Sequence, residues 1–232
     1  MPINNLTEDV YGMLVGSSGG GAAPFEFGNA LQSDGVNDYV SFPDISFTTG
    51  TVSFWFKTEE STGAFLISSS TSGQAYIMVR ADLNQISIRI GGVFRTFNFT
   101  EMNQSEWYHC MVSCGVTETN VYLNGVASSD NPTTLSGTTN FDYFFRLWST
   151  SNYYEASLDE VAIWNGVVGT QQNAIDLYNS GNGDLASSVI ASPTAYWRCN
   201  EADGATTLVD ETGNYNGTLN NFSTQPAYFV PH

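Results

Sequence analysis

The chain has 232 residues, of which 41% are hydrophobic and 14% aromatic, enough apolar material for a substantial core. It carries 23 Asp and Glu residues against 6 Lys and Arg, a formal net charge of -17. This balance argues against binding to nucleic acid or to anionic membranes, because both require clustered basic residues. No apolar run approaches the ~18 residues of a membrane span. The composition predicts a soluble, acidic, globular protein.

The first 24 residues end in the Gly/Ser run GSSGGGAAP, which predicts a flexible N-terminal arm or linker. This segment has neither a basic start nor a continuous apolar stretch, so we expect no secretory signal. Cys110 and Cys114 fall on one face of an expected strand, about 13 Å apart and beyond disulfide reach. Buried free thiols are therefore expected, and they favour synthesis in a reducing cytoplasm.

From Phe25 onward the chain consists of short alternating segments separated by Gly, Asn, Ser and Asp. Asn124-Gly125 is a hairpin signal, because both residues tolerate a positive φ. Many short strands at regular spacing predict an all-β fold, a two-sheet antiparallel β-sandwich or jelly roll. The expected strands cover residues 52–57, 64–67, 75–79, 86–90, 93–97, 107–112, 121–123, 143–148 and 158–164.

One short helix is expected after the last of these strands. Thr170 can cap its N-terminus and Gly181 can end it. Its apolar stripe consists of Ala174, Ile175, Leu177 and Tyr178. We expect this helix to close one end of the sandwich, a structural role.

Five motifs in order resemble the laminin-G-like, concanavalin A-like lectin/glucanase family. They are SDGVNDYV at 33–40, TVSFWFK at 51–57, WYHC at 107–110, VYLNG at 121–125 and LDEVAIW at 158–164. Together they span roughly residues 25 to 185. The resemblance implies the concanavalin A-like sandwich and says less about function, because one fold hosts many activities.

The C-terminal segment from Ala195 to Leu219 is similar to the part that opens the domain in most members of this family. About 38 residues cannot bury a second core, so we expect a circular permutation. Residues 1–24 then form the arm, 25–186 the sandwich, and 187–232 a segment that completes the same sandwich. The alternative is that this segment is exchanged between subunits.

The resemblance also implies a structural calcium ion where the first strand, the Asp-Gly turn and the late Asp-Glu strand meet. By comparison of the motifs, the resemblance implies that its ligands are Asp159, Glu201 and the backbone around Asp34 and Gly35. These groups supply the oxygen ligands that Ca²⁺ prefers. The alternative interpretation is that these carboxylates belong to solvated turns. A further acidic group, Asp203, Asp210 and Glu211, is expected in a turn-rich surface loop.

Glycan binding is the second candidate, because sugar sites combine an aromatic platform with amide, carboxylate and backbone hydrogen-bonding groups. The candidates lie around the polar loop at residues 149–152 and are Tyr143, Trp148, Asn152, Tyr153 and Tyr154. In the alternative interpretation Trp148 is a core residue and the tyrosines cover hydrophobic surface.

Catalysis is not expected. The paired carboxylates of the glucanase branch, in the pattern E-x-D-x-x-E, do not occur. The histidines His109 and His232 lie in a hydrophobic strand and at the terminal position, which does not suggest a Ser-His-Asp arrangement.

The main functional hypothesis is a non-enzymatic virion structural protein, part of a capsid decoration, tail or fibre. The composition, poor in Lys and rich in Asn, Ser, Thr and Gly, is similar to that of laminin-G-like domains in virion proteins of marine bacteriophages. Its partners would be other virion proteins, and it would be present in many copies that its acidic surface keeps from aggregating. Its location would be the virion, assembled in a host cytoplasm. The alternative is a secreted carbohydrate-binding module, assisted by calcium, in an extracellular location.

Overall fold

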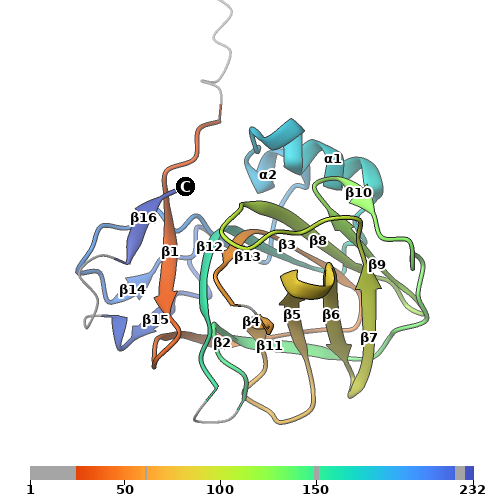
Figure 1. Ribbon diagram of the computed structural model, residues 1–232, viewed down its shortest axis with the longest axis horizontal. Coiled ribbons are helices and arrows are strands. Elements are labelled where there is room, and N and C mark those ends of the chain that lie inside the picture. The colour runs from red at the N-terminus through yellow and green to blue at the C-terminus, as the bar shows by residue number, and fades with distance from the viewer. Residues whose placement is uncertain (1–24, 61, 149–151, 223–227) are drawn as a thin grey trace, which may run out of the picture.

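The computed structural model describes residues 25–60, 62–148, 152–222 and 228–232. The expected N-terminal arm at 1–24 lies outside the described residues. Two antiparallel sheets pack face to face as a β-sandwich, with two short helices on the outside of one sheet (Figure 1). None of the helices in the described parts of the chain is long and apolar enough to cross a membrane. The expected fold class is thus confirmed.

The first sheet, sheet A, has the strand order β10-β9-β8-β3-β12-β1-β16, and β13 also pairs with β12. Its strands are β10 (Val126–Ala127), β9 (Thr119–Leu123), β8 (Tyr108–Cys114), β3 (Gly50–Thr58), β12 (Glu155–Asn165), β1 (Asn29–Asp34), β16 (Phe229–Pro231) and β13 (Ala195–Trp197). The Asn124-Gly125 turn joins β9 to β10 with both residues at positive φ, as expected for a tight hairpin.

The second sheet, sheet B, has the order β14-β15-β2-β11-β4-β5-β6-β7. Its strands are β14 (Thr207–Leu208), β15 (Gly217–Asn220), β2 (Tyr39–Phe47), β11 (Thr139–Phe144), β4 (Ala64–Ser68), β5 (Tyr76–Arg80), β6 (Gln85–Ile90) and β7 (Val93–Asn98). Alternation sets the two faces of each strand. In β6, for example, Ile86, Ile88 and Ile90 are buried in the core, which leaves Ser87 and Arg89 on the outer face.

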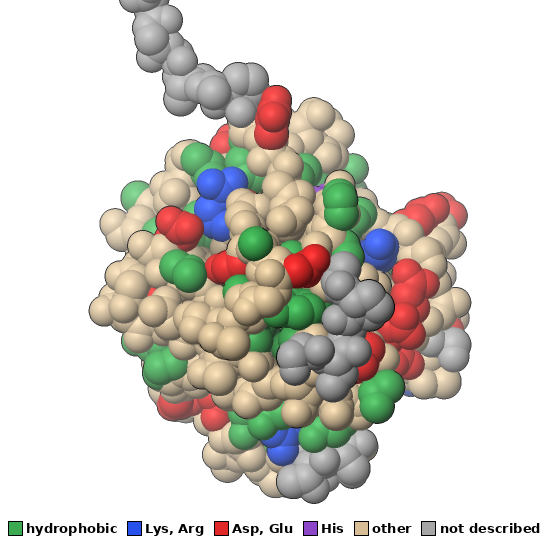
Figure 2. All heavy atoms as spheres, turned by 90° about the vertical axis from the view of Figure 1, so that its left-hand side faces the viewer, with side chains coloured by type: hydrophobic (Ala, Val, Ile, Leu, Met, Phe, Trp, Pro, Cys, Tyr) green, Lys and Arg blue, Asp and Glu red, His purple; other side chains and the backbone are tan. Residues whose placement is uncertain are grey.

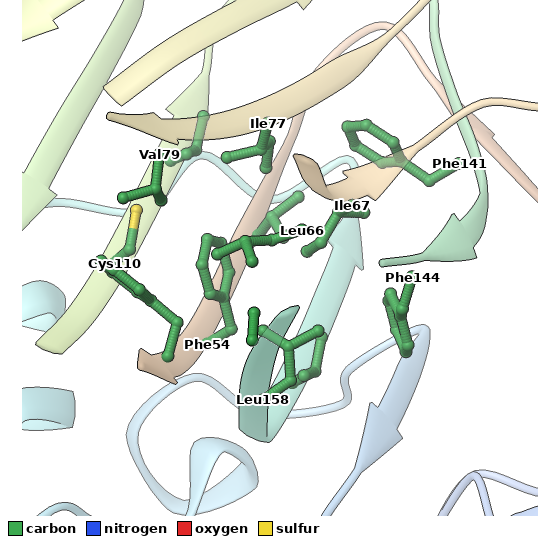
Figure 3. Packing of buried hydrophobic residues seen from close by; sticks show 14 of the residues in the cluster. Phe54, Leu66, Ile67, Ile77, Val79, Cys110, Phe141, Phe144 and Leu158 are labelled. Carbon is green, nitrogen blue, oxygen red and sulfur yellow. The ribbon is translucent and has the colours of Figure 1, made fainter. Parts of the chain in front are cut away.

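The core lies between the two sheets and is built from branched and aromatic side chains. Phe54 of β3 and Leu158 of β12 face Leu66 and Ile67 of β4 and Val79 of β5 across the interface (Figure 3). All three cysteines are buried free thiols within this cluster, which agrees with the expectation that Cys110 and Cys114 act as small core residues.

The C-terminal segment joins both sheets of its own chain. β13 pairs with β12, with Trp197 opposite Val161; β15 pairs with β2; and β16 pairs with β1. Trp197 is fully buried and contacts Phe42 and Phe144 of sheet B. This one residue therefore ties the last part of the chain to the centre of the sandwich.

Helices cover part of the outer face of sheet A. α1 (Gln171–Tyr178) starts at a capping box between Thr170 and Asn173, as the sequence indicates. It ends at Tyr178 rather than at Gly181, because Asn179 adopts the left-handed conformation. A second helix of one turn, α2 (Ala186–Val189), was not expected. The two helices pack on Met111, Tyr122 and Trp164 in a separate small hydrophobic cluster.

The strand expected at 143–148 is shifted in the structure. β11 ends at Phe144, because Phe145 has a positive φ of 62° and turns the chain out of the sheet. Residues 145–148 instead pair with residues 152–154, in what we call the hairpin: the Tyr154 amide donates to the Phe145 carbonyl, and the Leu147 amide donates to the Asn152 carbonyl. This hairpin lies beside sheet B and carries four of the five expected glycan-binding residues.

Candidate functional site: the outer face of sheet B

A single line of side chains crosses the outer face of sheet B. Residues that oppose each other in an antiparallel sheet stand side by side on one face, and here the registers of seven neighbouring strands align. We call this line the aromatic row. It consists of Thr218, Ser41, Tyr143, Ser68, Tyr76, Arg89 and Phe94.

The aromatic row is long. Six steps between strands at ~4.8 Å each give about 29 Å from one end to the other. Its aromatic members are extended by neighbours from other elements. Tyr76 lies 6.3 Å from Phe94 and 6.0 Å from Trp148 between ring centroids, and Phe65 lies 4.8 Å from Tyr76. Tyr76 and Ser68 are themselves buried, so the accessible part of this extended platform is formed by Phe94 and by the half-buried Phe65, Tyr143 and Trp148.

Three tyrosines surround the guanidinium of Arg146 at one end of this platform. The Arg146 Cζ lies 4.4 Å from the ring centroid of Tyr39, 4.8 Å from that of Tyr143 and 5.8 Å from that of Tyr153. Cation–π attraction of this kind strengthens where water is excluded, and Arg146 is only 9% exposed. The arginine therefore fixes the orientation of the three rings.

The structure brings the expected glycan-binding residues to this one face. Tyr143 is in the row, Trp148 contacts Tyr76, Tyr153 contacts Tyr39, and Tyr154 packs against Phe65. Asn152 is exposed in the hairpin, next to residues 149–151 of the expected loop, which lie outside the described residues. Trp148 is half-buried and is not among the members of the core clusters.

Sequence reasoning missed Tyr39, Tyr76, Arg89, Phe94 and Arg146. Tyr39, Tyr76, Arg89 and Phe94 had a signal in the alternation of their strands, because each stands next to an apolar residue, whereas Arg146 lies beyond the end of β11 and had none. What the sequence lacks is the pairing register, and only the register shows that residues from distant strands form one line.

The hydroxyls of this face stay protonated at neutral pH. Burial raises the pKa of Tyr143 and of Tyr76, and burial together with the charge of Glu60 raises that of Tyr154 to about 12. Burial also raises the pKa of Asp142, whose carboxylate accepts a hydrogen bond of 2.5 Å from the Ser70 amide. The face thus offers hydroxyl donors and acceptors beside the aromatic rings.

The four residues of the calcium expectation do not converge on one point. Asp34 opposes Glu155 in the β1–β12 register. Glu155 precedes Asp159 by four residues in β12, so Asp34 and Asp159 are separated by about 13 Å along the strand direction. The Asp34 carboxylate accepts from the Val36 amide, whereas that of Asp159 contacts the Glu160 amide and His232. Within the described segments no three His, Cys, Asp or Glu side chains could hold a metal ion together. The set does not fit one ion, and calcium binding itself stays a prediction.

Asp159 belongs instead to a buried polar cluster on the outer face of sheet A. Its carboxylate lies 2.6 Å from the Nδ1 of His232, whose ring stacks between Phe27 and Trp107. Burial raises the pKa of Asp159 to about 8 and lowers that of His232 to about 4. Burial thus acts on both groups in the direction of their neutral forms.

Glu160, the next residue, completes this cluster on the other side. It accepts hydrogen bonds from the Tyr196 hydroxyl and from the Arg198 Nε, the latter at 3.0 Å. Burial raises the pKa of Glu160 to about 7. Its φ of 48° falls in a bulge of β12, where the register with β3 shifts. The bulge turns Glu160 towards β13, so the contact attaches the C-terminal segment to β12.

The expectation that Asp210 lies in a solvated surface loop is wrong, because its side chain is buried and holds a turn together. It is 2% exposed and accepts hydrogen bonds from the backbone amides of Tyr196, Thr212, Asn214 and Tyr215 at 2.8 to 3.1 Å. Although burial acts to raise it, these hydrogen bonds hold the pKa of Asp210 below its usual value. The sequence pattern D-x-T-G-N-Y therefore encodes a tight turn built around one carboxylate.

Two cavities lie elsewhere. One of about 440 Å³ is lined by residues including Phe99, Tyr108 and Val126, near the β10 edge of sheet A. Another of about 410 Å³ is lined by residues including Tyr196, Arg198 and Glu211, beside α2. Both are open, and neither combines several aromatic faces in the way that the aromatic row does.

Solved structures with this fold include a protein of Bacteroides ovatus described as a candidate carbohydrate-binding protein. It has a TM-score of 0.63 at 18% identity over 85% of this chain and 59% of that chain, so the chain spans less than two thirds of its length. A heptameric SAP-like pentraxin from Limulus polyphemus has a TM-score of 0.52 at 12% identity, over 85% of this chain and 96% of that chain.

A Trypanosoma rangeli sialidase has a TM-score of 0.50 at 13% identity, over 66% of this chain and 28% of that chain. These likenesses establish the fold alone. Comparison with curated proteins finds no match. A family model, Laminin_G_3, matches residues 34–174, more than half of the chain. The chain therefore belongs to this family of the concanavalin A-like lectin/glucanases superfamily.

Proposed function

We propose that this protein binds carbohydrate, without cleaving it, on the outer face of sheet B. The observation that carries the proposal is the aromatic row. The C–H faces of a pyranose ring are apolar and pack on aromatic rings, while its hydroxyls need polar partners. Amphipathic aromatic side chains such as Tyr and Trp meet both needs.

The length of the platform favours an extended saccharide over a single sugar. Rings from Tyr143, Tyr76 and Phe94 recur along the row, and Ser41 and Thr218 add hydroxyls at one end. An oligosaccharide laid along about 29 Å would meet an aromatic ring at intervals, with polar side chains between. Binding without hydrolysis is favoured because cleavage requires two carboxylates placed on either side of one glycosidic bond, and the Asp142 carboxylate is held by the Ser70 amide.

A glycan array probed with the labelled protein tests this proposal, followed by calorimetry on the saccharides that bind. We expect binding to oligosaccharides, lost or strongly weakened in the double variant Tyr143→Ala/Trp148→Ala. Trp107→Ala is the matched control, because Trp107 is also half-buried but stacks on His232 on the other sheet. No binding on a broad array, or full binding by the double variant, would contradict the proposal.

Display on a virus particle is a second proposal, favoured by charge. A net charge of -17 from 23 acids and 6 bases would keep closely spaced copies soluble. Figure 2 shows the side of the molecule that carries β1, β14, β15 and β16, where acidic side chains gather towards one edge and basic ones are few. Such a protein would be a capsid, tail or fibre component assembled in a host cytoplasm. Immunogold labelling of purified particles tests this, and labelling only of free protein would argue against it.

A further inference from the structure

Few positive charges are available in this chain, and their placement is uneven. The six basic residues are Lys57, Arg80, Arg89, Arg95, Arg146 and Arg198. Two of them are held by carboxylates, Arg80 by Asp82 at 2.9 Å and Arg198 by Glu160 at 3.0 Å. Two others, Arg89 and Arg146, lie in or beside the aromatic row. An otherwise acidic protein therefore carries two arginines on the face that we propose binds sugar.

Arg89 stands in the middle of the aromatic surface. Its neighbours in the register are Tyr76 on β5 and Phe94 on β7, and Trp148 lies on the far side of Tyr76. The guanidinium lies over Gly73, where an added Cβ would be 3.6 Å from an Arg89 Nη. Gly73 therefore lies in ordinary contact range of the guanidinium, and its φ of 76° accounts for the glycine at this position.

The protein does not neutralise Arg89. In the parts of the chain that the structure describes, no carboxylate lies within ion-pair distance of it, and its Nε is buried without a hydrogen-bond partner. A buried donor without a partner costs free energy, and 23 acidic residues were available to supply one. The neighbouring polar group is the Tyr76 hydroxyl: burial raises the pKa of Tyr76, while the charge of Arg89 and a hydrogen bond from its side chain act to lower it.

We propose that Arg89 is the subsite for a carboxylate carried by the sugar, so that the ligand is an acidic glycan. The planar guanidinium matches a carboxylate in a bidentate arrangement. Tyr76 and Phe94 stand on either side of it, and the exposed ring of Phe94 offers aromatic surface for the pyranose ring that bears the carboxylate. The inference rests on the proposed function and specifies its ligand class, since a neutral sugar would leave the Arg89 charge without a counter-charge.

The test compares saccharides that differ only in this charge. An oligogalacturonide and its methyl ester share ring, linkage and length, and sialyllactose and its methyl ester form a second pair. We expect the wild-type protein to bind at least one acidic probe about 10- to 100-fold more tightly than its neutral counterpart, the range of a charge-assisted hydrogen bond. Titration calorimetry at fixed salt measures the ratio.

Three variants assign this preference to Arg89. Arg89→Gln should bind both members of a pair alike, and Arg89→Lys should keep a reduced preference, because it retains charge and loses the planar fork. Arg95→Gln removes the same charge from the adjacent strand, where Arg95 Nη1 donates to the Phe94 carbonyl, and should keep the full preference. Thermal melting checks that all three are folded.

The outcomes separate the two proposals. Equal binding of acid and ester by the wild-type protein, or an unchanged preference in Arg89→Gln, overturns the Arg89 subsite and leaves carbohydrate binding standing. A preference for a sulfated saccharide over the carboxylated probes also overturns it. No binding to any saccharide overturns both.

Discussion

Trp148 and Tyr76 come from a hairpin and from a central strand, yet their ring centroids lie 6.0 Å apart on the outer face of sheet B. The indole reaches Tyr76 because the chain leaves β11 at Phe145, where φ is positive. This contact joins the hairpin residues to the aromatic row.

Trp148→Ala should weaken saccharide binding about 10-fold or more, because central aromatic residues carry much of the free energy of binding. The midpoint of thermal unfolding should change little, since the indole is only half-buried. Calorimetry and melting curves measure the two effects. A variant that melts much lower and binds as well as the wild-type protein would assign Trp148 a structural role.

Trp197→Ala, in contrast to Trp148→Ala, should lower the stability of the fold strongly. The Trp197 side chain is fully buried against Phe42 and Phe144, and removing a core tryptophan costs about 3–5 kcal/mol. Since a domain of this kind has about 5–15 kcal/mol in total, we expect a large drop in the urea midpoint. A small effect would mean that the C-terminal segment contributes little to the core.

Asp210→Asn should destabilise the protein by about 3 kcal/mol at neutral pH, because several amide donors lose a charged acceptor. The pKa of Asp210 is lowered by folding, so its contribution is present above the unfolded value of about 3.8 and is lost as the pH falls through the folded value. The difference between wild type and variant should therefore shrink in acid. Urea unfolding at several pH values measures it, with the exposed Asp176→Asn as control.

Asp159→Asn should flatten the fall in stability that the wild-type protein shows as the pH rises towards 8. Folding raises the pKa of Asp159 from 3.8 to about 8, so its contribution is full below 3.8 and is lost as the pH rises through about 8. His232, with a pKa lowered from 6.5 to about 4, loses its contribution on the acid side, below 6.5. Between pH 6.5 and pH 8 the change in stability therefore comes from Asp159 and from Glu160, whose pKa is about 7. Because the variant changes only Asp159, the difference between its melting curves and those of the wild type reports on Asp159. An equal slope in wild type and variant would show that Asp159 is ionised in the folded protein.

The fold could be predicted because its signals are local. Alternation in segments such as β6 and the Asn124-Gly125 turn depend on neighbours a few residues apart, and the Thr170 cap made α1 predictable. The strand expected at 143–148 was misplaced because the local apolar pattern does not indicate that Phe145 adopts a left-handed conformation.

The site was only half predictable. The hairpin aromatics are clustered in sequence, so Tyr143, Trp148, Tyr153 and Tyr154 could be grouped. Tyr76 and Arg89 join them through strand registers, which a single sequence does not specify. Calcium ligands carried over by motif failed to converge because Asp34 and Asp159 stand at different levels of the β1–β12 pair.

The order in which the strands pair has a consequence for synthesis of the protein. β1 and β2 emerge from the ribosome before the other strands described here, but their partners β16 and β15 follow more than 170 residues later. Until then both early strands have an open edge, and closing such distant contacts is slow. The nascent chain must therefore remain soluble with unfinished sheets, and its low content of positive charge and excess of negative charge would keep neighbouring nascent chains apart during that interval.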